Sequence, residues 1–245
     1  MFFTGFNITT ILGALLLFAG LVILNEVTRR NKVLSILMYI VFPLVMTLFF
    51  WPKRAGGNVG GTWFAWVKTY SALAGVLIFM AIRYNKKLAQ KKWMLFLPAA
   101  ILALNIAEAV MAEIECAGMS GEVVAGLVMK GGIWNYLNAA AGVLLILTMT
   151  GTFGIRVAKT GSKDMVWADM GWPWIIAYDI WNLSYCYNCI SNRSFYAGFI
   201  LLFACTFAEF AIARGAWLQH RAQTLALFAM FSLTLDYSSL DRKST

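Results

Sequence analysis

The stretch ILGALLLFAGLVIL (residues 11–24) indicates the fold, because it carries no charged side chain and no amide over its whole length. A second long apolar stretch, LSILMYIVFPLVMTLFFW (residues 34–51), follows after a short basic segment. A helix needs roughly 20 mainly apolar residues to cross about 30 Å of hydrocarbon. Outer-membrane barrels instead alternate apolar and polar residues in segments of about ten. The continuous runs therefore predict membrane-spanning helices and exclude a barrel.

The composition leads to the same all-α class. Hydrophobic residues make up 61% of the 245 residues and charged residues 13%, against roughly 25% charged residues in a soluble domain. One core could not bury so much apolar side chain, so we expect a polytopic transmembrane helical bundle that lipid covers. The net charge of +9 is typical of basic cytoplasmic loops in membrane proteins, and no nucleic-acid partner is expected.

Eight apolar segments are predicted as spans of one transmembrane domain, residues 1–235, which precedes a polar C-terminal tail, residues 236–245. The last segment has 14 residues, fewer than the roughly 17–25 that are usual, so seven spans is the alternative. The stretch from Glu113 to Ile133 is Gly-rich and partly apolar, which favours an interfacial or re-entrant segment. The predicted spans are Phe6–Leu24, Val33–Trp51, Trp63–Ile82, Trp93–Ala112, Trp134–Ile155, Trp172–Ile190, Phe195–Ala213 and Ala222–Leu235.

The basic residues orient these spans. If successive segments between spans lie on alternate sides of the membrane, 13 Lys and Arg residues lie on one side, with Arg221 among them. The other 7, with Lys68 among them, lie on the opposite side. The segment Arg83–Lys92 contributes most, because five of its ten residues are basic. Since cytoplasmic loops carry the excess of Lys and Arg, we expect the N-terminus outside. Met1–Thr10 has no basic start and no cleavage site typical of a signal peptide, so the first span is expected to remain.

Three carboxylates fall well inside predicted spans: Glu108, Asp179 and Glu209. A carboxylate at the bilayer centre costs about 3 kcal/mol even on insertion scales, so it usually faces a partner or water and marks a functional site. Asn105 shares a helix face with Glu108 in the outer half of span four. Glu209 lies near the inner surface, and its alternative role is that of an interface residue paired with Arg214.

The segment GWPWIIAYDIWNLSYCYNC (residues 171–189) concentrates polar and aromatic side chains in span six. Tyr178, Asn182 and Tyr185 share one face by i, i+4, i+7 spacing. Asp179 and Trp181 lie beside this face, and Trp or Tyr next to a carboxylate favours a cation or a planar ligand. We therefore expect this helix to face a ligand cavity or, alternatively, a hydrogen-bond network that fixes helix packing.

Span five begins with two amides, Asn135 and Asn138, which lie near one helix face. We expect these amides to meet the outer ends of spans four and six. The small residues that follow, Ala139 to Gly142, suit close packing between helices.

The four cysteines support an alternative function. Cys186 and Cys189 form a C-Y-N-C pair at the outer end of span six, and Cys116 lies just beyond span four. Membrane thiol oxidoreductases use such a pair near the oxidising face to pass electrons to a quinone, although Cys is also a common small packing residue. His220 is the only histidine, so a bis-histidine haem is excluded, and we expect no metal and no cofactor.

The runs GWPWIIAYDIWNLSYCYNC (residues 171–189) and WLQHRAQTLALFAMF (residues 217–231) resemble a family of bacterial multipass membrane proteins known only as a domain of unknown function. The resemblance covers most of the chain and implies a bacterial plasma membrane, without an activity. The size and span count are also similar to vitamin-precursor uptake carriers of the nicotinamide riboside type. Because the spacing of Trp and Asn differs from that family, no site residue is carried over.

These observations predict a small transporter or channel that moves a cation or small organic solute between spans four and seven. Rocking of helices would expose the site to each side in turn. The alternatives are a thiol–quinone oxidoreductase and a non-catalytic sensor or assembly subunit. The expected partners are the lipid bilayer and a cation or small molecule, with a homo-oligomer as a further option. The predicted pathway residues are Asp179, Asn182, Tyr178, Trp181, Tyr185, Glu108, Asn105, Asn138 and Glu209.

Overall fold

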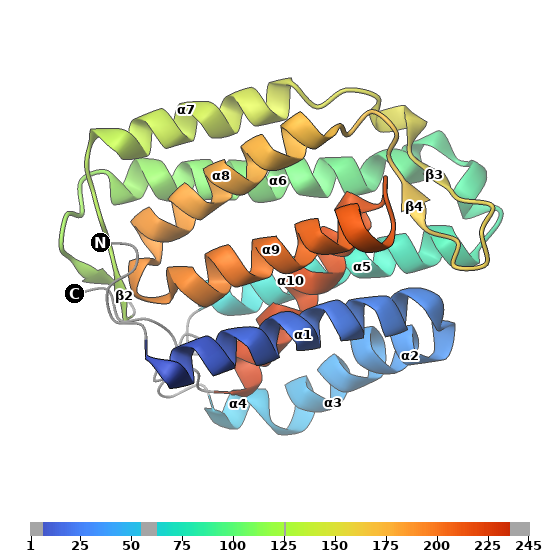
Figure 1. Cartoon of the computed structure of the whole chain (residues 1–245), viewed down its shortest axis with the longest axis horizontal. Helices are drawn as coiled ribbons and strands as arrows, with labels where there is room; N and C mark the ends of the chain where they lie inside the picture. The colour runs from blue at the N-terminus through green and yellow to red at the C-terminus, as the bar shows by residue number, and fades with distance from the viewer. Residues whose placement is uncertain (1–6, 55–62, 125, 236–245) are drawn as a thin grey trace.

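The computed structural model describes residues 7–54, 63–124 and 126–235. Within these residues, helices run back and forth between the two ends of an elongated bundle (Figure 1). A short antiparallel hairpin lies at each end: β1 (Val123–Val124) pairs with β2 (Leu127–Val128), and β3 (Arg156–Val157) pairs with β4 (Met165–Val166). We name the two ends the β1–β2 end and the β3–β4 end. The helices are α1 (Ile8–Arg30), α2 (Lys32–Ile36), α3 (Phe42–Phe49), α4 (Trp51–Arg54), α5 (Trp63–Tyr84), α6 (Lys92–Cys116), α7 (Ile133–Leu147), α8 (Trp172–Cys189), α9 (Leu201–Phe207) and α10 (Trp217–Thr234).

Shorter helical turns complete the chain. A π-helical stretch, η1 (Leu37–Val41), joins α2 to α3, and two others, η6 (Phe195–Ile200) and η7 (Ala208–Ile212), flank α9. The 3₁₀ turns are η3 (Leu88–Gln90), η4 (Thr152–Gly154) and η5 (Ser191–Arg193).

Several of these helices have the length and composition of membrane spans, which confirms the predicted helical class. Their number in the described part of the chain is five: Ile8–Arg30, Lys32–Phe49, Ala65–Tyr84, Lys92–Cys116 and Phe195–Ile212. The apolar helix α7 has 15 residues. The more polar helices α8 and α10 have 18 residues each, which corresponds to about 27 Å at 1.5 Å per residue. The predicted polar tail, residues 236–245, lies outside the described residues.

The predicted span Trp134–Ile155 is too long, because α7 ends at Leu147. The hydroxyl of Thr148 turns back onto the carbonyl of Leu144 at 2.8 Å. Gly151 then adopts a left-handed backbone with φ of 63°, a conformation that costs Gly least. Residues that bond to their own backbone and a left-handed Gly end the helix before the β3–β4 hairpin.

The predicted span Ala222–Leu235 is too short, because α10 begins at Trp217. Gln219 and His220 are fully buried, and each has a partner inside the bundle. The amide of Asn25 donates to Nδ1 of His220 at 2.9 Å, and Nε2 of Gln219 donates to Asp164 at 3.0 Å. Polar residues that are satisfied by neighbouring helices do not end a helix, although they interrupt the hydrophobic pattern from which the span was predicted.

The segment predicted as interfacial or re-entrant divides into two structures. Helix α6 continues past Ala112 to Cys116, so Glu113 is helical. The β1–β2 hairpin follows, and two side chains beyond α8 hold it in place. Ser191 Oγ donates to the carbonyl of Val128 at 2.9 Å, and Asn192 donates to the carbonyl of Gly126 at 2.9 Å. The hairpin is therefore tied to the end of α8.

Helix α10 lies at the centre of the bundle. Most of its side chains are buried, and it packs against α1, α5 and α9; in Figure 1 it runs behind α1 and α9. One hydrophobic cluster joins these four helices through residues such as Leu21, Val76 and Leu201. A second cluster joins α6, α7 and α8 through residues such as Ile106 and Ile175.

Helix α7 packs tightly against α6 and α8 at Gly142. A Cβ atom there would lie 2.5 Å from Cγ2 of Val110 and 2.9 Å from Nε1 of Trp181, so only Gly fits without movement. The indole of Trp181 donates to the carbonyl of Asn138 at 2.9 Å. The predicted close packing of this small-residue stretch is confirmed at Gly142.

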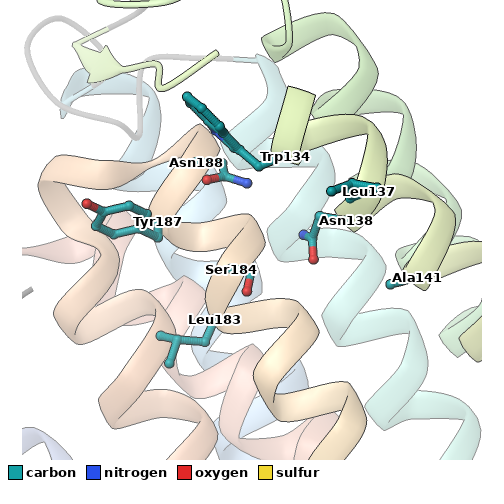
Figure 2. A pocket seen from close by; sticks show the side chains of 8 residues that line it. All are labelled: Trp134, Leu137, Asn138, Ala141, Leu183, Ser184, Tyr187 and Asn188. Atoms are coloured by element: carbon teal, nitrogen blue, oxygen red, sulfur yellow. The ribbon is translucent and has the colours of Figure 1, made fainter. Parts of the chain in front are cut away.

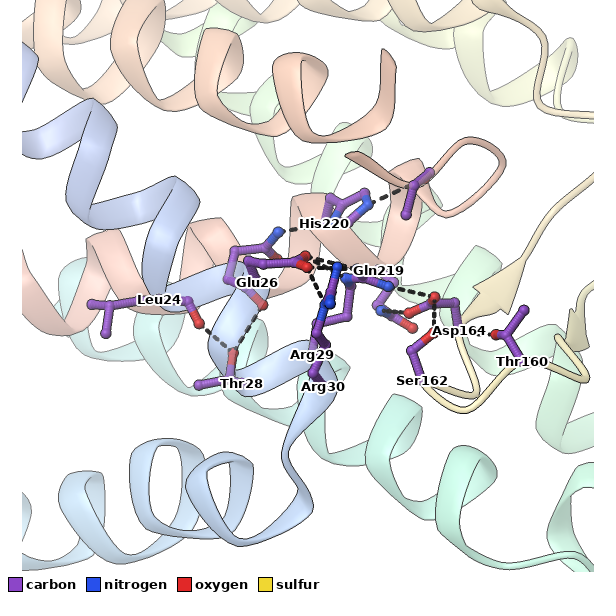
Figure 3. Close-up of polar contacts among 12 residues, drawn as sticks. Leu24, Glu26, Thr28, Arg29, Arg30, Thr160, Ser162, Asp164, Gln219 and His220 are labelled. Carbon is purple, nitrogen blue, oxygen red and sulfur yellow. Dashed lines mark hydrogen bonds and ion pairs between the residues drawn. The ribbon is translucent and has the colours of Figure 1, made fainter. Parts of the chain in front are cut away.

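A polar cluster joins α1, α5 and α10 to the β3–β4 hairpin, and Figure 3 shows its contacts from α1 and α10. Arg29 of α1 binds Asp164 of the hairpin loop at 2.6 Å and Glu26 at 2.7 Å. The second oxygen of Asp164 accepts a hydrogen bond from Gln219 of α10 at 3.0 Å. Arg83 of α5 donates to backbone carbonyls in the same hairpin loop. We call these five residues the Asp164 cluster.

The two carboxylates of the Asp164 cluster are matched, because Arg29 forms an ion pair with each of them, whereas Arg83 donates to backbone carbonyls. Burial by itself would raise the pKa of Asp164. Hydrogen bonds from Ser162 and Gln219, together with the charges of Arg29 and Arg83, outweigh burial and hold this pKa below its usual value of 3.8. The cluster therefore fixes α1, α5 and α10 to one another at the β3–β4 end.

Candidate binding cavity

A cavity of about 170 Å³ lies inside the bundle, between α5, α6, α8, α9 and α10. Its lining residues recur at helical spacing, such as Tyr178, Asn182 and Tyr185 of α8. Leu127 of β2 contributes to the lining at the β1–β2 end. The polar lining residues are Lys68, Thr69, Asn105, Tyr178, Asn182, Tyr185, Cys186, Arg193, Arg221 and Ser232.

One wall of the cavity carries Lys68 of α5. Its ammonium group donates to Oδ1 of Asn105 at 2.9 Å and to Oε2 of Glu108 at 3.2 Å. The side chains of Lys68 and Glu108 are each 26% exposed, and partly solvated pairs contribute only about 0–1 kcal/mol. Lys68 is therefore held at the cavity wall by one amide and one carboxylate.

Another wall carries Arg221 of α10, which is 6% exposed. Its Nε donates to the hydroxyl of Tyr178 at 3.3 Å, and its guanidinium carbon lies 5.8 Å from the centre of the same ring. Among the described residues, Nη1 of Arg221 has no hydrogen-bond partner and no carboxylate forms an ion pair with this side chain. A buried guanidinium with so little compensation is costly, which makes Arg221 the most informative residue of the cavity.

The predicted polar face of α8 does meet this cavity, together with one predicted residue of α6. The helix turns this face inward because its other faces pack on α7 and α9. The predicted pathway residues that line the cavity are Tyr178, Asn182, Tyr185 and Asn105.

Two of the predicted carboxylates lie beside the cavity and not in it. Glu108 turns toward Lys68 at its edge. Asp179 is one residue further around α8 than Tyr178, a rotation of about 100°, and so faces α9. There its Oδ2 accepts from the hydroxyl of Thr206 at 2.5 Å. Asp179 was predicted as a pathway residue, but in the structure it lies beside the cavity and not in its lining.

The remaining predicted residues hold helices together. Trp181 and Asn138 join α8 to α7. Glu209 is 5% exposed and accepts from the backbone amide of Gly215 at 2.6 Å, just before α10 begins. A carboxylate at a helix N-terminus is favourable, so Glu209 caps α10, and it forms no ion pair with Arg214 in the described structure.

Comparison with known proteins assigns a family. Residues 5–243 match the sequence profile of the Family of unknown function (DUF5692). The chain belongs to this family. No curated protein and no solved structure matches it. The resemblance of the α8 and α10 sequences to a family of unknown function is therefore confirmed as DUF5692 membership.

The DUF5692 chain has a second buried carboxylate site at Glu113 of α6. Three amides donate to its oxygens: Asn135 at 2.5 Å, Asn138 at 2.6 Å and Asn188 at 3.1 and 3.2 Å. Glu113 and Asn135 are fully buried. The expected meeting of the amides of span five with spans four and six is confirmed, because Asn135 and Asn138 of α7 reach α6 and Asn138 also reaches the backbone of α8.

A groove of about 620 Å³ lies on the surface between α7 and α8, above the Glu113 site. Figure 2 shows Asn138 and Asn188 directed toward the space between the two helices, with Trp134 and Tyr187 nearby. The groove is larger than the cavity, but its lining contains no charged side chain. Its two amides are already bonded to Glu113, so the cavity is the stronger candidate for a binding site in this DUF5692 chain.

The cysteines proposed for redox chemistry are all free and buried in the structure. The thiol of Cys186 lines the cavity and points to Oδ1 of Asn182 at 3.9 Å. The thiol of Cys189 points instead to the carbonyl of Ala112 at 3.8 Å. The two thiols of the C-Y-N-C pair thus face different neighbours.

Sequence reasoning missed several residues of these sites, among them Lys68, Arg221 and Glu113. The two cations were counted as orienting charges near the membrane surfaces, although Lys68 is the sixth residue of the predicted span Trp63–Ile82. The rule that ionisable residues within spans mark function applies to cations as well as to carboxylates, and it would have found Lys68. Glu113 fell one residue beyond a predicted span end, where no such signal applies.

Proposed function

We propose that this member of the DUF5692 family is a small integral membrane transporter that carries a small organic solute through the cavity. The observation behind the proposal is a cavity lined by polar and cationic side chains inside an otherwise apolar bundle. Polar groups that face the interior of such bundles usually line substrate pathways. A volume of about 170 Å³ is well above the roughly 15 Å³ that one water molecule requires, so the cavity suits a small molecule.

The placement in a membrane rests on the surface of the bundle. Large apolar side chains are exposed along α1 and α7, for example Leu12 at 52%, Leu16 at 74% and Leu144 at 61%. Extended exposed apolar surface is typical of membrane contact. We propose eight spans, with α7, α8 and α10 added to the five apolar helices, in a bacterial plasma membrane. The N-terminus would lie outside and the β3–β4 end, which carries Arg30, Lys86 and Lys92, would lie in the cytoplasm.

The two ends of the bundle suggest how access alternates. The cavity approaches the β1–β2 end, where Leu127 of the hairpin and Arg193 of η5 contribute to its lining. Side-chain hydrogen bonds with Ser191 and Asn192, together with one backbone bond from Lys130, join this hairpin region to α8 and η5. Release of the hairpin would open the cavity at that end, while the Asp164 cluster keeps the opposite end closed.

Transport can be tested with purified protein in proteoliposomes and three labelled probes of one shape: benzoate, benzamide and benzylamine. Uptake is measured for the wild type, for Ala229→Phe, which fills the cavity from α10, and for the matched control Ala74→Phe, at an exposed position on α5. We expect uptake of at least one probe above that of empty liposomes, loss of this uptake in Ala229→Phe and no change in Ala74→Phe.

Two outcomes would contradict the proposal. Equal uptake of all three probes by liposomes with wild-type protein and by empty liposomes would contradict transport of such solutes. Uptake that persists in a folded Ala229→Phe variant would show that the solute does not pass through this cavity.

A further inference from the structure

The charge of the cavity lining is one-sided. Lys68, Arg193 and Arg221 contribute cations, and none of the described lining residues is a carboxylate. Among the described carboxylates beside the cavity are Glu108, which is turned to Lys68, and Asp179, which accepts a hydrogen bond from Thr206 of α9.

The geometry of Arg221 indicates what is missing from its surroundings. A buried guanidinium is most stable when a carboxylate accepts two parallel hydrogen bonds from it. In this chain its described partner is a phenol at 3.3 Å from Nε, and Nη1 is buried without a hydrogen-bond partner among the described residues. Nη1 is therefore a buried donor, on a residue of the cavity lining, that no acceptor among the described residues uses.

Lys68 provides a second anchor from α5. Its bonds to Asn105 and Glu108, at 2.9 and 3.2 Å, are those of a partly exposed group. An anion in the cavity would compete with Glu108 for the ammonium group, and Asn105 would keep Lys68 directed inward.

We propose that the cavity binds a small organic monoanion, whose carboxylate lies between Arg221 and Lys68 and whose apolar part lies against Leu201, Leu225 and Phe228. This inference rests on the proposed function, whose cargo it names, and it replaces the cation expected from the sequence. The apolar side chains of the lining favour a carboxylate on an apolar body over a compact inorganic anion, because an inorganic anion would leave that surface unfilled.

Binding without transport provides the test. Wild-type protein in detergent is titrated with benzoate, benzamide and benzylamine, and the shift of the unfolding temperature is recorded, because a ligand that binds only the folded state raises it. We expect a shift with benzoate and not with the neutral or cationic probe. Arg221→Gln should weaken benzoate binding by about tenfold to a hundredfold, and Arg214→Gln, which removes an exposed cation near the start of α10, should leave it unchanged.

A second variant covers the case in which Arg221→Gln fails to fold. Lys68→Gln acts from another wall and should also weaken benzoate binding, by a smaller factor. The inference is overturned if benzylamine binds and benzoate does not, if no probe binds, or if folded Arg221→Gln and Lys68→Gln bind benzoate as the wild type does.

The binding assay and the uptake assay can contradict the anion site and the transport proposal independently of each other. Benzoate binding that depends on Arg221 without uptake in liposomes would support the anion site and contradict transport. Uptake of benzylamine that Ala229→Phe blocks, without benzoate binding, would support transport and contradict the anion site.

Discussion

Two buried polar regions of this chain differ in whether their arginine side chains form ion pairs. In the Asp164 cluster, Arg29 meets two carboxylates within 2.7 Å, and the second oxygen of Asp164 is bonded to α10. In the cavity, Arg221 has a phenol and an aromatic ring as neighbours and no ion pair among the described residues. Matched buried charges hold helices together, whereas an unmatched charge on a cavity wall indicates the charge of the ligand. The following predictions test this difference, from the largest effect to the smallest.

Removal of Arg29 should have the largest effect. Arg29→Met leaves the buried carboxylate of Asp164 without its ion-pair partner, and breaking a buried pair in this way costs about 3–5 kcal/mol. The measurement is thermal unfolding of the purified protein in detergent. Arg30→Met is the matched control, because Arg30 pairs with the same Glu26 from a side chain that is 68% exposed and should contribute about 0–1 kcal/mol. Equal losses from the two variants would mean that the Asp164 cluster does not hold the bundle.

Replacement of Glu113 should have the next largest effect. Glu113→Leu removes the acceptor of three amides, and each buried donor left unsatisfied costs about 1–3 kcal/mol. Part of this cost is offset because Asn138 and Asn188 also line the surface groove, so we expect a net loss of about 2–3 kcal/mol in the free energy of unfolding. Glu115→Leu, at an exposed position two residues later, is the control. A stable Glu113→Leu variant would show that the amides find other acceptors.

Acidification should weaken the Asp164 cluster. The pKa of Asp164 is lower in the folded chain than its ordinary value of 3.8, so ionised Asp164 stabilises the fold at pH values above 3.8. This stabilisation is lost as the pH falls through the lowered pKa. Unfolding temperatures recorded from neutral pH to about pH 3 should fall less steeply in Asp164→Asn than in the wild type. Asp169→Asn, at an exposed acid between β4 and α8, should keep the wild-type slope, and identical slopes in all three proteins would exclude Asp164 as the titrating group.

Removal of Arg221 should have the smallest effect on stability and the largest on ligand binding. Because Arg221 forms no ion pair among the described residues, Arg221→Gln breaks no ion pair and removes a buried cation. We therefore expect the free energy of unfolding to change by no more than about 1 kcal/mol. Unfolding in detergent, compared directly with Arg29→Met, measures the contrast between the two regions. A loss for Arg221→Gln as large as that for Arg29→Met would show that Arg221 holds the fold.

The sequence alone allowed the helices of this fold to be located. It also predicted part of the polar lining of the cavity. Tyr178, Asn182 and Tyr185 were found because helical spacing puts them on one face, and a lipid-facing helix would not carry them. Asp179, one position away, was expected to share their environment, but a rotation of about 100° per residue turns it to Thr206. Lys68 and Arg221 were read as surface charges, because a linear sequence does not show which charges near span ends face inward.

What the sequence by itself determined is the helical class of the protein, with apolar runs long enough to span a membrane and a polar segment at residues 171–189. These properties depend on local composition and period, which are present in the chain before it folds. The tertiary structure alone decided which charges are matched. Arg29 and Asp164 are 135 residues apart, and Lys68 and Arg221 line one cavity from different helices. Charge matching depends on distances across the bundle, and those distances arise only when the helices pack.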